Sequence, residues 1–459
     1  MIASCFVIAA LLWSGRAVLL NILLAFFVFR VYLTRPYVDI FLPNLNGAQL
    51  DYILTNNYFF NSSDAAIVYL SLLSLLLAWL FGLLIAQPKQ VRLISPPWIF
   101  RQVDKIVMAS SWPFWLAWAL LSVLNFKSAT ETWQGIATGE NSALFAFGLF
   151  STATINLVCL YAFMLPRQPG VRQPPLILLF PVLFSAALGI MGGSRSAIFA
   201  IAVLALSYWI FINFGKHIGR RDLLRTIPWA IFLPVTIFGG LIAQLLRPLL
   251  RSGVDAETIW KAMLEGLDLS NPENPLVGTL YFGLSELLHR LSSLKAQFVI
   301  LNDHLVHDPW ETYNPLSTLM RIINDLVPGD VFDNVLTINQ LFDYIYYDSL
   351  VTYNSETWSI QGTLYLYFGF WLSPIIVFCA AYGVGRHHAR LDALAKTSPA
   401  FAIFLILLVN DLIEFGTLER AIPVDIVRPL ASFLAVIFLV RLLRAPFPAK
   451  RKLPLSVNH

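Results

Sequence analysis

The sequence contains little charge, and this shortage limits the class of protein it can be. Charged side chains make up 13% of the 459 residues, whereas soluble domains contain about 25%. Hydrophobic residues make up 58%, and long apolar runs with few charges recur along the whole chain. The composition excludes an ordinary soluble enzyme and predicts an all-α polytopic membrane protein.

Cysteine is also scarce, because only Cys5, Cys159 and Cys379 are present. All three lie inside apolar runs, and their spacing indicates neither a disulfide nor a thiolate metal site. We predict that they are small hydrophobic residues of the core. The first apolar run resembles a signal sequence, but it continues beyond Arg16 to Phe29, which favours a retained first span over a cleaved signal.

About ten membrane spans are predicted, since a helix crosses the hydrocarbon in about 20 residues. The predicted spans cover residues 10–29, 64–86, 106–126, 142–165, 174–192, 196–214, 228–246, 359–384, 398–418 and 425–443. One helix over residues 175–213 would measure about 58 Å, which is twice the hydrocarbon thickness. We therefore expect two short spans in this run, with the break at Gly189, Gly192 and Gly193.

The predicted spans divide the chain into three parts and also orient it. The parts are 1–247 with spans one to seven, 248–358 as one large extramembrane segment, and 359–459 with the last three spans and a tail. Basic residues concentrate in the tail and in alternate loops. These loops are 87–105, 166–173, 215–227 and 385–397. The positive-inside rule therefore predicts that both termini are cytoplasmic. The large segment and the turn at Arg195 then lie on the outer face.

The large outer segment is acidic, and its hydrophobic pattern predicts helices. Leucines in "SELLHRLSSLKAQFVI" (285–300) recur at the spacing of an amphipathic helix. "STLMRIINDLVPGD" (317–330) predicts a second short helix that ends at Pro328 and Gly329. The sequence contains neither the alternation typical of strands nor an internal repeat. We therefore expect one folded, helical segment outside the membrane.

Four arginines are predicted to lie near the outer boundary of the membrane. They are Arg195, Arg247, Arg251 and Arg290. A guanidinium group is always charged and binds phosphate oxygens through two parallel hydrogen bonds. These arginines, with a backbone opened by Gly192 and Gly193, predict a pocket for a lipid diphosphate.

A purely structural interpretation exists for three of these arginines. Arg247 and Arg251 are also explained as interfacial side chains that extend towards water. Arg290 is also explained as the partner of Glu286 one helical turn away. Arg195 is the hardest to explain structurally, because a tight turn between two short spans needs no cation.

One face of the helix predicted over 285–300 contains the candidate catalytic residues. Glu286, His289 and Arg290 share this face because they are separated by three and four positions. The face would hold an anionic leaving group beside a general base, which makes His289 and Glu286 the candidate bases. A lone histidine on a helix is otherwise structural. His304 and His307 lie between carboxylates, a pattern that is usually a solvated loop, and we predict no metal site.

Three stretches of the sequence share features with one family of membrane enzymes. They are "GGSRSA" (192–197) between two short spans, "SELLHRLSSLKAQFVI" in the outer segment, and "GTLYLYFGFWLSPIIVFCAAYGVGR" (362–386) after it. The last stretch contains the pair Phe368-Gly369 and ends in Gly385-Arg386. In this layout the chain from about residue 140 to 445 resembles the oligosaccharide repeat-unit polymerases, the Wzy-type O-antigen polymerase family.

The resemblance implies a C-type glycosyltransferase fold and activity on the periplasmic face of the bacterial inner membrane. Such an enzyme joins undecaprenyl-diphosphate-linked oligosaccharides, which serve as donor and acceptor, into the O-antigen of lipopolysaccharide or a related surface polysaccharide. It needs no nucleotide sugar, metal or other cofactor. A chain-length regulator protein is an expected partner, and nucleic acid is not. Arg195 and Arg290 match the arginines expected to hold the diphosphate, and no residue matches a family base.

Three alternatives remain open from the sequence. An O-antigen ligase of similar layout would use a histidine of the outer segment, for which His289, His304 and His307 are available. A flippase or precursor transporter is disfavoured by the absence of sequence repeats and by the few charges within the predicted spans. A lipid-linked mannosyltransferase would have paired acidic residues in its first outer loop, where only the separated Asp39 and Asp51 occur.

Overall fold

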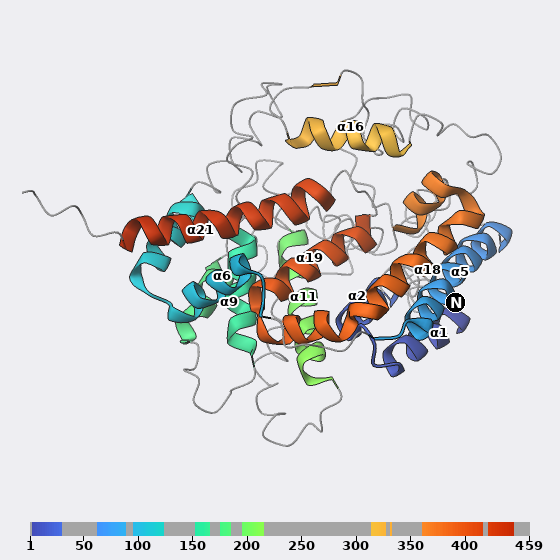
Figure 1. Ribbon diagram of the computed structural model, residues 1–459, viewed down its shortest axis with the longest axis horizontal. Coiled ribbons are helices and arrows are strands. Elements are labelled where there is room, and N and C mark those ends of the chain that lie inside the picture. Colours follow the sequence, from blue (N-terminus) through green and yellow to red (C-terminus); the bar gives the residue numbers. More distant parts are fainter. Residues whose placement is uncertain are drawn as a thin grey trace, which may run out of the picture.

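The computed structural model of the chain is a bundle of helices with one helix set apart from the rest (Figure 1). It describes residues 2–29, 62–88, 95–123, 152–165, 175–184, 195–214, 314–326, 331–332, 360–415 and 421–444. These described residues are 90% helical and contain no strand. The predicted all-α class is therefore confirmed for this part of the chain.

Twelve labelled helical elements follow one another along the described ranges. They are α1 (Ile2–Trp13), α2 (Val18–Val28), α5 (Ser62–Ile85), α6 (Trp98–Ala109), α9 (Thr152–Met164), η2 (Leu176–Leu179), α11 (Arg195–Asn213), α16 (Pro315–Leu326), α18 (Ile360–Thr397), α19 (Pro399–Phe415), η3 (Ala421–Val427) and α21 (Arg428–Arg444). A further apolar helix, Trp112–Val123, directly follows α6.

Two of the described helices are long and apolar enough to cross a membrane. They are Ile360–Thr397 and Asp425–Arg444, and the bent pair formed by α6 and Trp112–Val123 is a third candidate. Single helices also occupy the predicted spans 64–86, 196–214 and 398–418, as α5, α11 and α19. The predicted span 228–246 lies outside the described residues.

The prediction of one continuous span over residues 10–29 is wrong. The chain turns between α1 and α2, where Gly15 has φ 63° and Ala17 has φ 46°. Both angles lie in the left-handed region, which a helix does not tolerate. Arg16 lies in this turn, and its Nη1 donates to the carbonyl oxygens of Leu83, Leu84 and Ala86 at the end of α5. The turn therefore provides the Arg16 guanidinium with hydrogen-bond acceptors, which this cation would lack inside a continuous apolar span.

A second break replaces the predicted start of the span 106–126. Helix α6 ends at Ala109, because Ser110 is left-handed with φ 44°. The helix Trp112–Val123 then continues at a bend of 108°. Helix α6 is amphipathic, with Phe100, Val103, Ile106 and Val107 buried. Residues 98–105, predicted as part of a loop, are therefore helical.

Helix α18 extends beyond its predicted span of 359–384. The segment 385–397, predicted as a cytoplasmic loop, continues the same helix to Thr397. A break does occur earlier, at Gly369, where φ is 66° and ψ is −178°. The hydroxyl of Ser373 donates to the carbonyl oxygens of Leu364 and Gly369, at 2.8 and 2.6 Å. It therefore satisfies acceptors that the break would otherwise leave open.

Small residues allow α5 and α18 to pack closely along their length. A Cβ atom added at Gly82 would lie 2.6 Å from the Cβ of Ala381, and one added at Gly385 would lie 2.6 Å from the Cβ of Ala86. Close approach through small residues is a common way to join helices in membranes. The two helices, nearly 300 residues apart in sequence, therefore form one rigid pair.

The buried apolar residues form two clusters. The larger joins α2, α6, α9, α11, α19 and α21, and the smaller joins α1, α2, α5 and α18. Cys159 is buried in the larger cluster, as predicted. The same prediction is wrong for Cys5 and Cys379, which are exposed. An apolar run in a membrane protein also supplies lipid-facing positions, so it does not by itself place a cysteine in the core.

Candidate functional site

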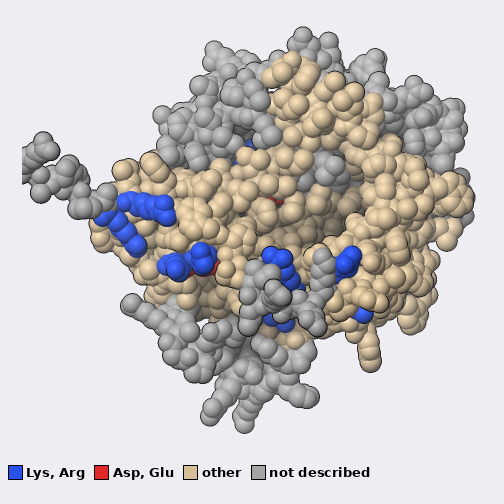
Figure 2. All heavy atoms as spheres, viewed as in Figure 1, with Lys and Arg blue, Asp and Glu red and all other residues tan. Residues whose placement is uncertain are grey.

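Most of the described Lys and Arg residues gather at one end of the bundle, which we name the basic end. Its members are Arg16, Arg101, Lys105, Arg386, Arg390, Lys396, Arg441 and Arg444. Across the face drawn in Figure 2, most of the visible Lys and Arg atoms lie in the lower half of the molecule. All members except Arg16 come from segments that the positive-inside rule assigns to one side of the membrane.

Contacts between separate helices join the basic end together. The carboxylate of Asp104 on α6 accepts hydrogen bonds from the hydroxyl of Ser398 and from the N–H of Ala400, the latter at 2.9 Å. A second carboxylate, Asp392 on α18, accepts from the N–H of Val18 at 3.3 Å. Ala400 and Val18 lie in the first turns of α19 and α2, so each carboxylate stabilises a helix N-terminus.

Helix α11 begins at Arg195 and ends at the basic end. Near its end, Phe211 lies under the ammonium of Lys396, with Nζ 5.2 Å from the ring centroid, and the hydroxyl of Tyr208 donates to the carbonyl oxygen of Ala395 at 3.2 Å. Sixteen residues separate Phe211 from Arg195, which is about 24 Å of helix. Arg195 therefore lies at the opposite end of α11 from the basic end.

Helix α21 has the same polarity. It begins at Arg428, while Arg441 and Arg444 lie in its last turn at the basic end. The preceding element η3 contacts α16, so the start of α21 lies on the side of the bundle where α16 crosses the top of Figure 1. We name the starts of α11 and α21, together with η3 and α16, the opposite end of the bundle.

Helix α16 confirms the short helix predicted over 317–330. The side chain of Asn314 accepts from the N–H groups of Leu316 and Ser317, each at 3.0 Å, which fixes the start of the helix. The side chain of Asn324 exchanges two hydrogen bonds with the backbone of Phe332, at 2.8 and 3.0 Å. The helix ends at Leu326, just before the predicted stop.

Helix α16 is joined to the bundle by a polar contact with α18. The hydroxyls of Thr318 and Tyr367 share a hydrogen bond, and Tyr367 lies two residues before the break of α18 at Gly369. Figure 2 shows a hollow in the surface below the top of the molecule, with an acidic atom visible inside it. Polar groups from α16 and α18 therefore meet at the contact between Thr318 and Tyr367.

The element η3 adds a buried carboxylate to the opposite end. Asp425 is 3% exposed and lies in the middle of this π-helix. A π-helix is rare, and short π segments occur frequently at functional sites. Arg321 on α16 and Arg428 at the start of α21 add two half-buried cations. The opposite end therefore combines guanidinium, carboxylate and phenol groups in a small region.

A network of hydrogen bonds connects the first turns of α18 to α5. The side-chain amide of Gln361 donates to the hydroxyl of Ser71 on α5. The hydroxyl of Tyr365 donates to the carbonyl oxygen of Ser71 at 3.0 Å and lies 3.0 Å from the hydroxyl of Ser74. These side chains are mostly buried, and their bonds fix the position from which Tyr367 extends.

The structure describes one of the predicted site residues and not the others. Arg195 is the first residue of α11, while the predicted break at Gly189, Gly192 and Gly193 and the side chain of Arg195 lie outside what the structure describes. The remaining predicted residues lie outside the described ranges. They are Arg247, Arg251, Glu286, His289 and Arg290. Within the described ranges, the structure therefore places one predicted site residue, Arg195.

Sequence reasoning missed the polar residues that the structure does gather at the opposite end. The short helix predicted over 317–330 contains Arg321, and the predicted span 425–443 contains Asp425 and Arg428, but neither pattern indicates that these are site residues. A signal was present, because a carboxylate and a guanidinium three residues apart are costly within an apolar run. Periodicity alone could not bring α16, α18 and η3 to one place.

The described residues contain no group of three or more His, Cys, Asp or Glu side chains placed to hold a metal ion. Comparisons with protein-family models, with curated proteins and with solved structures found no match to this sequence.

Proposed function

We propose that the protein is a glycosyltransferase that polymerises undecaprenyl-diphosphate-linked oligosaccharide units on the periplasmic face of the bacterial inner membrane. The observation that supports this best is the position of Arg195 at the start of α11, about 24 Å of helix from Lys396 at the basic end. If the basic end is cytoplasmic, Arg195 meets the outer membrane boundary, where a lipid diphosphate would lie.

The opposite end suits such a substrate in its chemistry. Arg321 and Arg428 lie at this end with Arg195, and guanidinium groups match the oxygens of a diphosphate better than ammonium groups do. Tyr367, whose ring contacts that of Phe368, and the backbone break at Gly369 add polar and aromatic groups. Aromatic rings and hydroxyls are common elements of carbohydrate sites. These features favour a site for a lipid-linked sugar over a purely structural end.

The proposed reaction transfers a glycan from one lipid carrier to another. Arg195 and Arg290, with Arg247 or Arg251, bind the donor diphosphate and stabilise the charge that grows as the bond from the anomeric carbon to the phosphate oxygen breaks. A hydroxyl of the acceptor glycan forms the new bond to that carbon. Its proton passes to His289 or Glu286, and undecaprenyl diphosphate leaves.

Arginine replacement tests this proposal most directly. A strain lacking the gene would be complemented with the wild type, Arg195→Ala or Arg195→Lys, and surface polysaccharide length would be measured on gels. We expect Arg195→Ala to abolish long chains, and Arg195→Lys to restore them only in part, because lysine cannot bind in a bidentate manner. Arg386→Ala, which removes an exposed cation at the basic end, is the matched control and should leave chain length unchanged.

The results of this experiment can refute the proposal or distinguish it from the other enzyme classes. Normal chain length from Arg195→Ala, at a membrane level equal to that of the wild type, would refute the diphosphate role of Arg195. The strain lacking the gene also separates the enzyme classes. Loss of a polymerase leaves single repeat units on the lipid core, loss of a ligase leaves polymer on the undecaprenyl carrier, and loss of a flippase leaves single units on the carrier.

A labelling experiment tests the orientation on which the proposal depends. Cys5, Cys159 and Cys379 would be replaced by serine or alanine, and a single cysteine would be placed at position 195 or at position 390. We expect a membrane-impermeant maleimide added to intact cells with a permeable outer membrane to label position 195 and not position 390. Labelling of position 390 alone would reverse the orientation and remove the proposed periplasmic site.

A further inference from the structure

The basic end contains a surface that combines cations with a lipid-facing stripe. Helix α6 has two exposed cations, Arg101 and Lys105, one turn apart on its polar face. The opposite face of α6 packs into the larger core cluster through Val103 and Val107, which are fully buried. Arg101 and Lys105 therefore point away from the protein, where side chains of α6 meet the surroundings.

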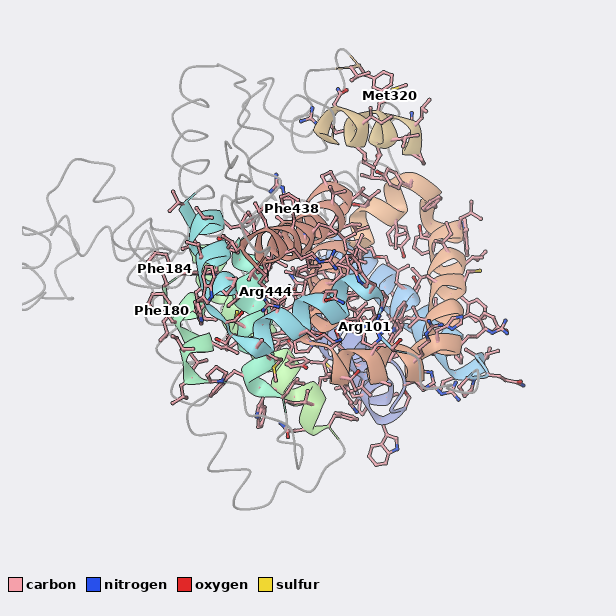
Figure 3. The ribbon with its side chains drawn as sticks, turned by 60° about the vertical axis from the view of Figure 1, so that its left-hand side comes forward. Arg101, Phe180, Phe184, Met320, Phe438 and Arg444 are labelled. Carbon is pink, nitrogen blue, oxygen red and sulfur yellow. The ribbon has the colours of Figure 1, made fainter. Side chains whose placement is uncertain are left out.

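The last turn of α21 adds two more cations beside α6. The guanidinium of Arg441 lies over the ring of Trp98, 5.3 Å from its centroid, and Nη2 of Arg444 donates to the hydroxyl of Ser111 at 2.9 Å. Trp98 begins α6 and Ser111 follows its end, so the two arginines lie along this helix. Figure 3 shows Arg101 and Arg444 beside α6, well away from Met320 of α16.

The nearest acidic side chain does not neutralise this group. Asp104 lies between Arg101 and Lys105 in sequence, but its carboxylate is directed at Ser398 and Ala400 in the first turn of α19. The contacts recorded for Arg441 and Arg444 are with an aromatic ring and a hydroxyl. Among the described residues, no acidic side chain is bonded to these four cations, which are therefore available to an anion from outside the protein.

The bend after α6 places this group at a membrane boundary. The helix Trp112–Val123 is bent by 108° from α6, so if this helix enters the bilayer along the membrane normal, α6 lies nearly parallel to the membrane plane. An amphipathic helix with cations on its polar face is typical of this position. Trp98 and Trp112 are 43% and 65% exposed at the two ends of α6, and tryptophan is enriched at membrane interfaces.

An exposed apolar stripe continues from the cations along the next helix. Its members are Trp112, Leu116, Leu120 and Val123, all exposed. They recur at intervals of four, four and three residues, so they lie on one face of the helix. A group of cations at the start of an apolar stripe has the polarity of a lipid molecule, with a headgroup at one end and an acyl chain at the other. A free phosphate would use only the first of these features.

We infer that α6 and the last turn of α21 form a binding site for one anionic phospholipid. The phosphate is held by Arg101, Lys105 and Arg444, and an acyl chain lies along the stripe that begins at Trp112. Basic pockets between helices at a cytoplasmic surface bind anionic headgroups in this way. This site lies at the basic end and is independent of the sugar-transfer activity proposed for the opposite end.

The site is tested with the full-length protein in neutral detergent by native mass spectrometry. Phosphatidylglycerol and phosphatidylcholine with the same acyl chains would compete for the protein at equal concentrations. We expect the wild type to bind more phosphatidylglycerol than phosphatidylcholine. In the variant Arg101→Gln with Lys105→Gln, we expect the ratio of the two bound lipids to fall about fivefold for each cation removed. Both side chains are exposed and the recorded contacts of the fold do not involve them, so this variant is expected to fold.

A matched variant removes two exposed cations from the same end. Arg386→Gln with Arg390→Gln changes α18 and should keep the preference of the wild type. The inference is overturned if the α6 variant keeps its preference, or if the α18 variant loses as much. Inorganic phosphate, added in excess over phosphatidylglycerol, should not displace the lipid. Displacement by phosphate would indicate an anion site that does not involve the apolar stripe.

Discussion

The carboxylate of Asp104 on α6 lies 2.9 Å from the backbone nitrogen of Ala400 in the first turn of α19, although 296 residues separate them in the sequence. The hydroxyl of Ser398 donates to the same carboxylate and also accepts from the N–H of Phe401 at 3.2 Å. One aspartate therefore connects the helix that lies across the basic end with the start of a helix that runs through the bundle.

Replacing Asp104 by alanine should destabilise the protein. The variant leaves the N–H of Ala400 in the first turn of α19 and the hydroxyl of Ser398 without their acceptor, at a cost of about 1 kcal/mol, as for other lost helix caps. Asp104→Asn should cost less, because its amide oxygen still accepts. Thermal unfolding followed by tryptophan fluorescence in detergent measures the difference. An unfolding temperature of Asp104→Ala equal to that of the wild type would contradict the capping role.

Stability should depend on pH through the same carboxylate. If α6 lies at the membrane surface, as inferred above, Asp104 is outside the spanning segments, where burial raises its pKa from 3.8 to about 6, despite the opposing hydrogen bonds from Ser398 and Ala400. A carboxyl whose pKa is raised by folding favours the folded state at low pH, and this contribution is lost as the pH rises through about 6. The unfolding temperature should therefore be higher at about pH 5 than at about pH 7.5. Asp104→Asn should reduce this difference, and an unchanged pH profile in that variant would assign the effect to another group.

The contact between α5 and α18 provides a pair of matched glycine variants. Gly82→Ala places a methyl group 2.6 Å from both the Cβ of Ala381 and the carbonyl oxygen of Phe378, so the helices must separate, at a cost of about 1–3 kcal/mol. Gly383→Ala, on the same helix pair, adds a methyl group with no atom within 4 Å and should be neutral or slightly stabilising. Thermal unfolding of the two variants would show the contrast. Equal unfolding temperatures would mean that α5 and α18 are not in close contact.

Arg16 should stabilise the turn between α1 and α2, because it donates hydrogen bonds to the carbonyl groups at the end of α5. Its guanidinium donates to the carbonyl oxygens of Leu84 and Ala86 at 3.0 and 2.8 Å, and also to that of Leu83. Arg16→Ala should lower the free energy of unfolding by about 1.5–3 kcal/mol, since these are hydrogen bonds from a charged donor. Limited proteolysis at the turn would report the local loosening. Arg390→Ala, which removes an exposed cation, serves as the control, and an equal effect of both variants would exclude a specific role for Arg16.

The sequence predicted the helices whose apolar runs are long and unbroken. The runs behind α5, α11 and α19 have the length of a helix and no strong breaker inside, so composition and length were sufficient. Helix α6 was assigned incorrectly because the apolar run that begins at Ile106 masked an amphipathic pattern over Phe100, Val103 and Val107. That pattern was present in the sequence and would have identified a helix that ends at Ser110.

The turn at Arg16 and the caps at the starts of α2 and α19 could not be predicted from the sequence for a different reason. The Ser14-Gly15-Arg16 triplet signals a turn, but the acceptors that make it favourable come from α5, more than 60 residues later. The bond between Asp104 and Ala400 likewise depends on how whole helices pack. Of the candidate site, only the position of Arg195 as the first residue of α11 is described; the glycines predicted to break the run before it lie outside the described residues. The grouping of α16, η3 and the break at Gly369 depends on tertiary packing and leaves no periodic signal.

The bend of 108° between α6 and the helix that follows it has a mechanical consequence. If α6 lies in the headgroup layer, as inferred above, the tryptophans at its two ends set how deeply the whole molecule is immersed in the bilayer. Because α6 is bonded to α19 and α21, these helices cannot rise or sink independently of it. Any change in bilayer thickness is then taken up at the far surface, where α11 begins, so the height of that surface relative to the lipid phosphates varies with the membrane in which the protein resides.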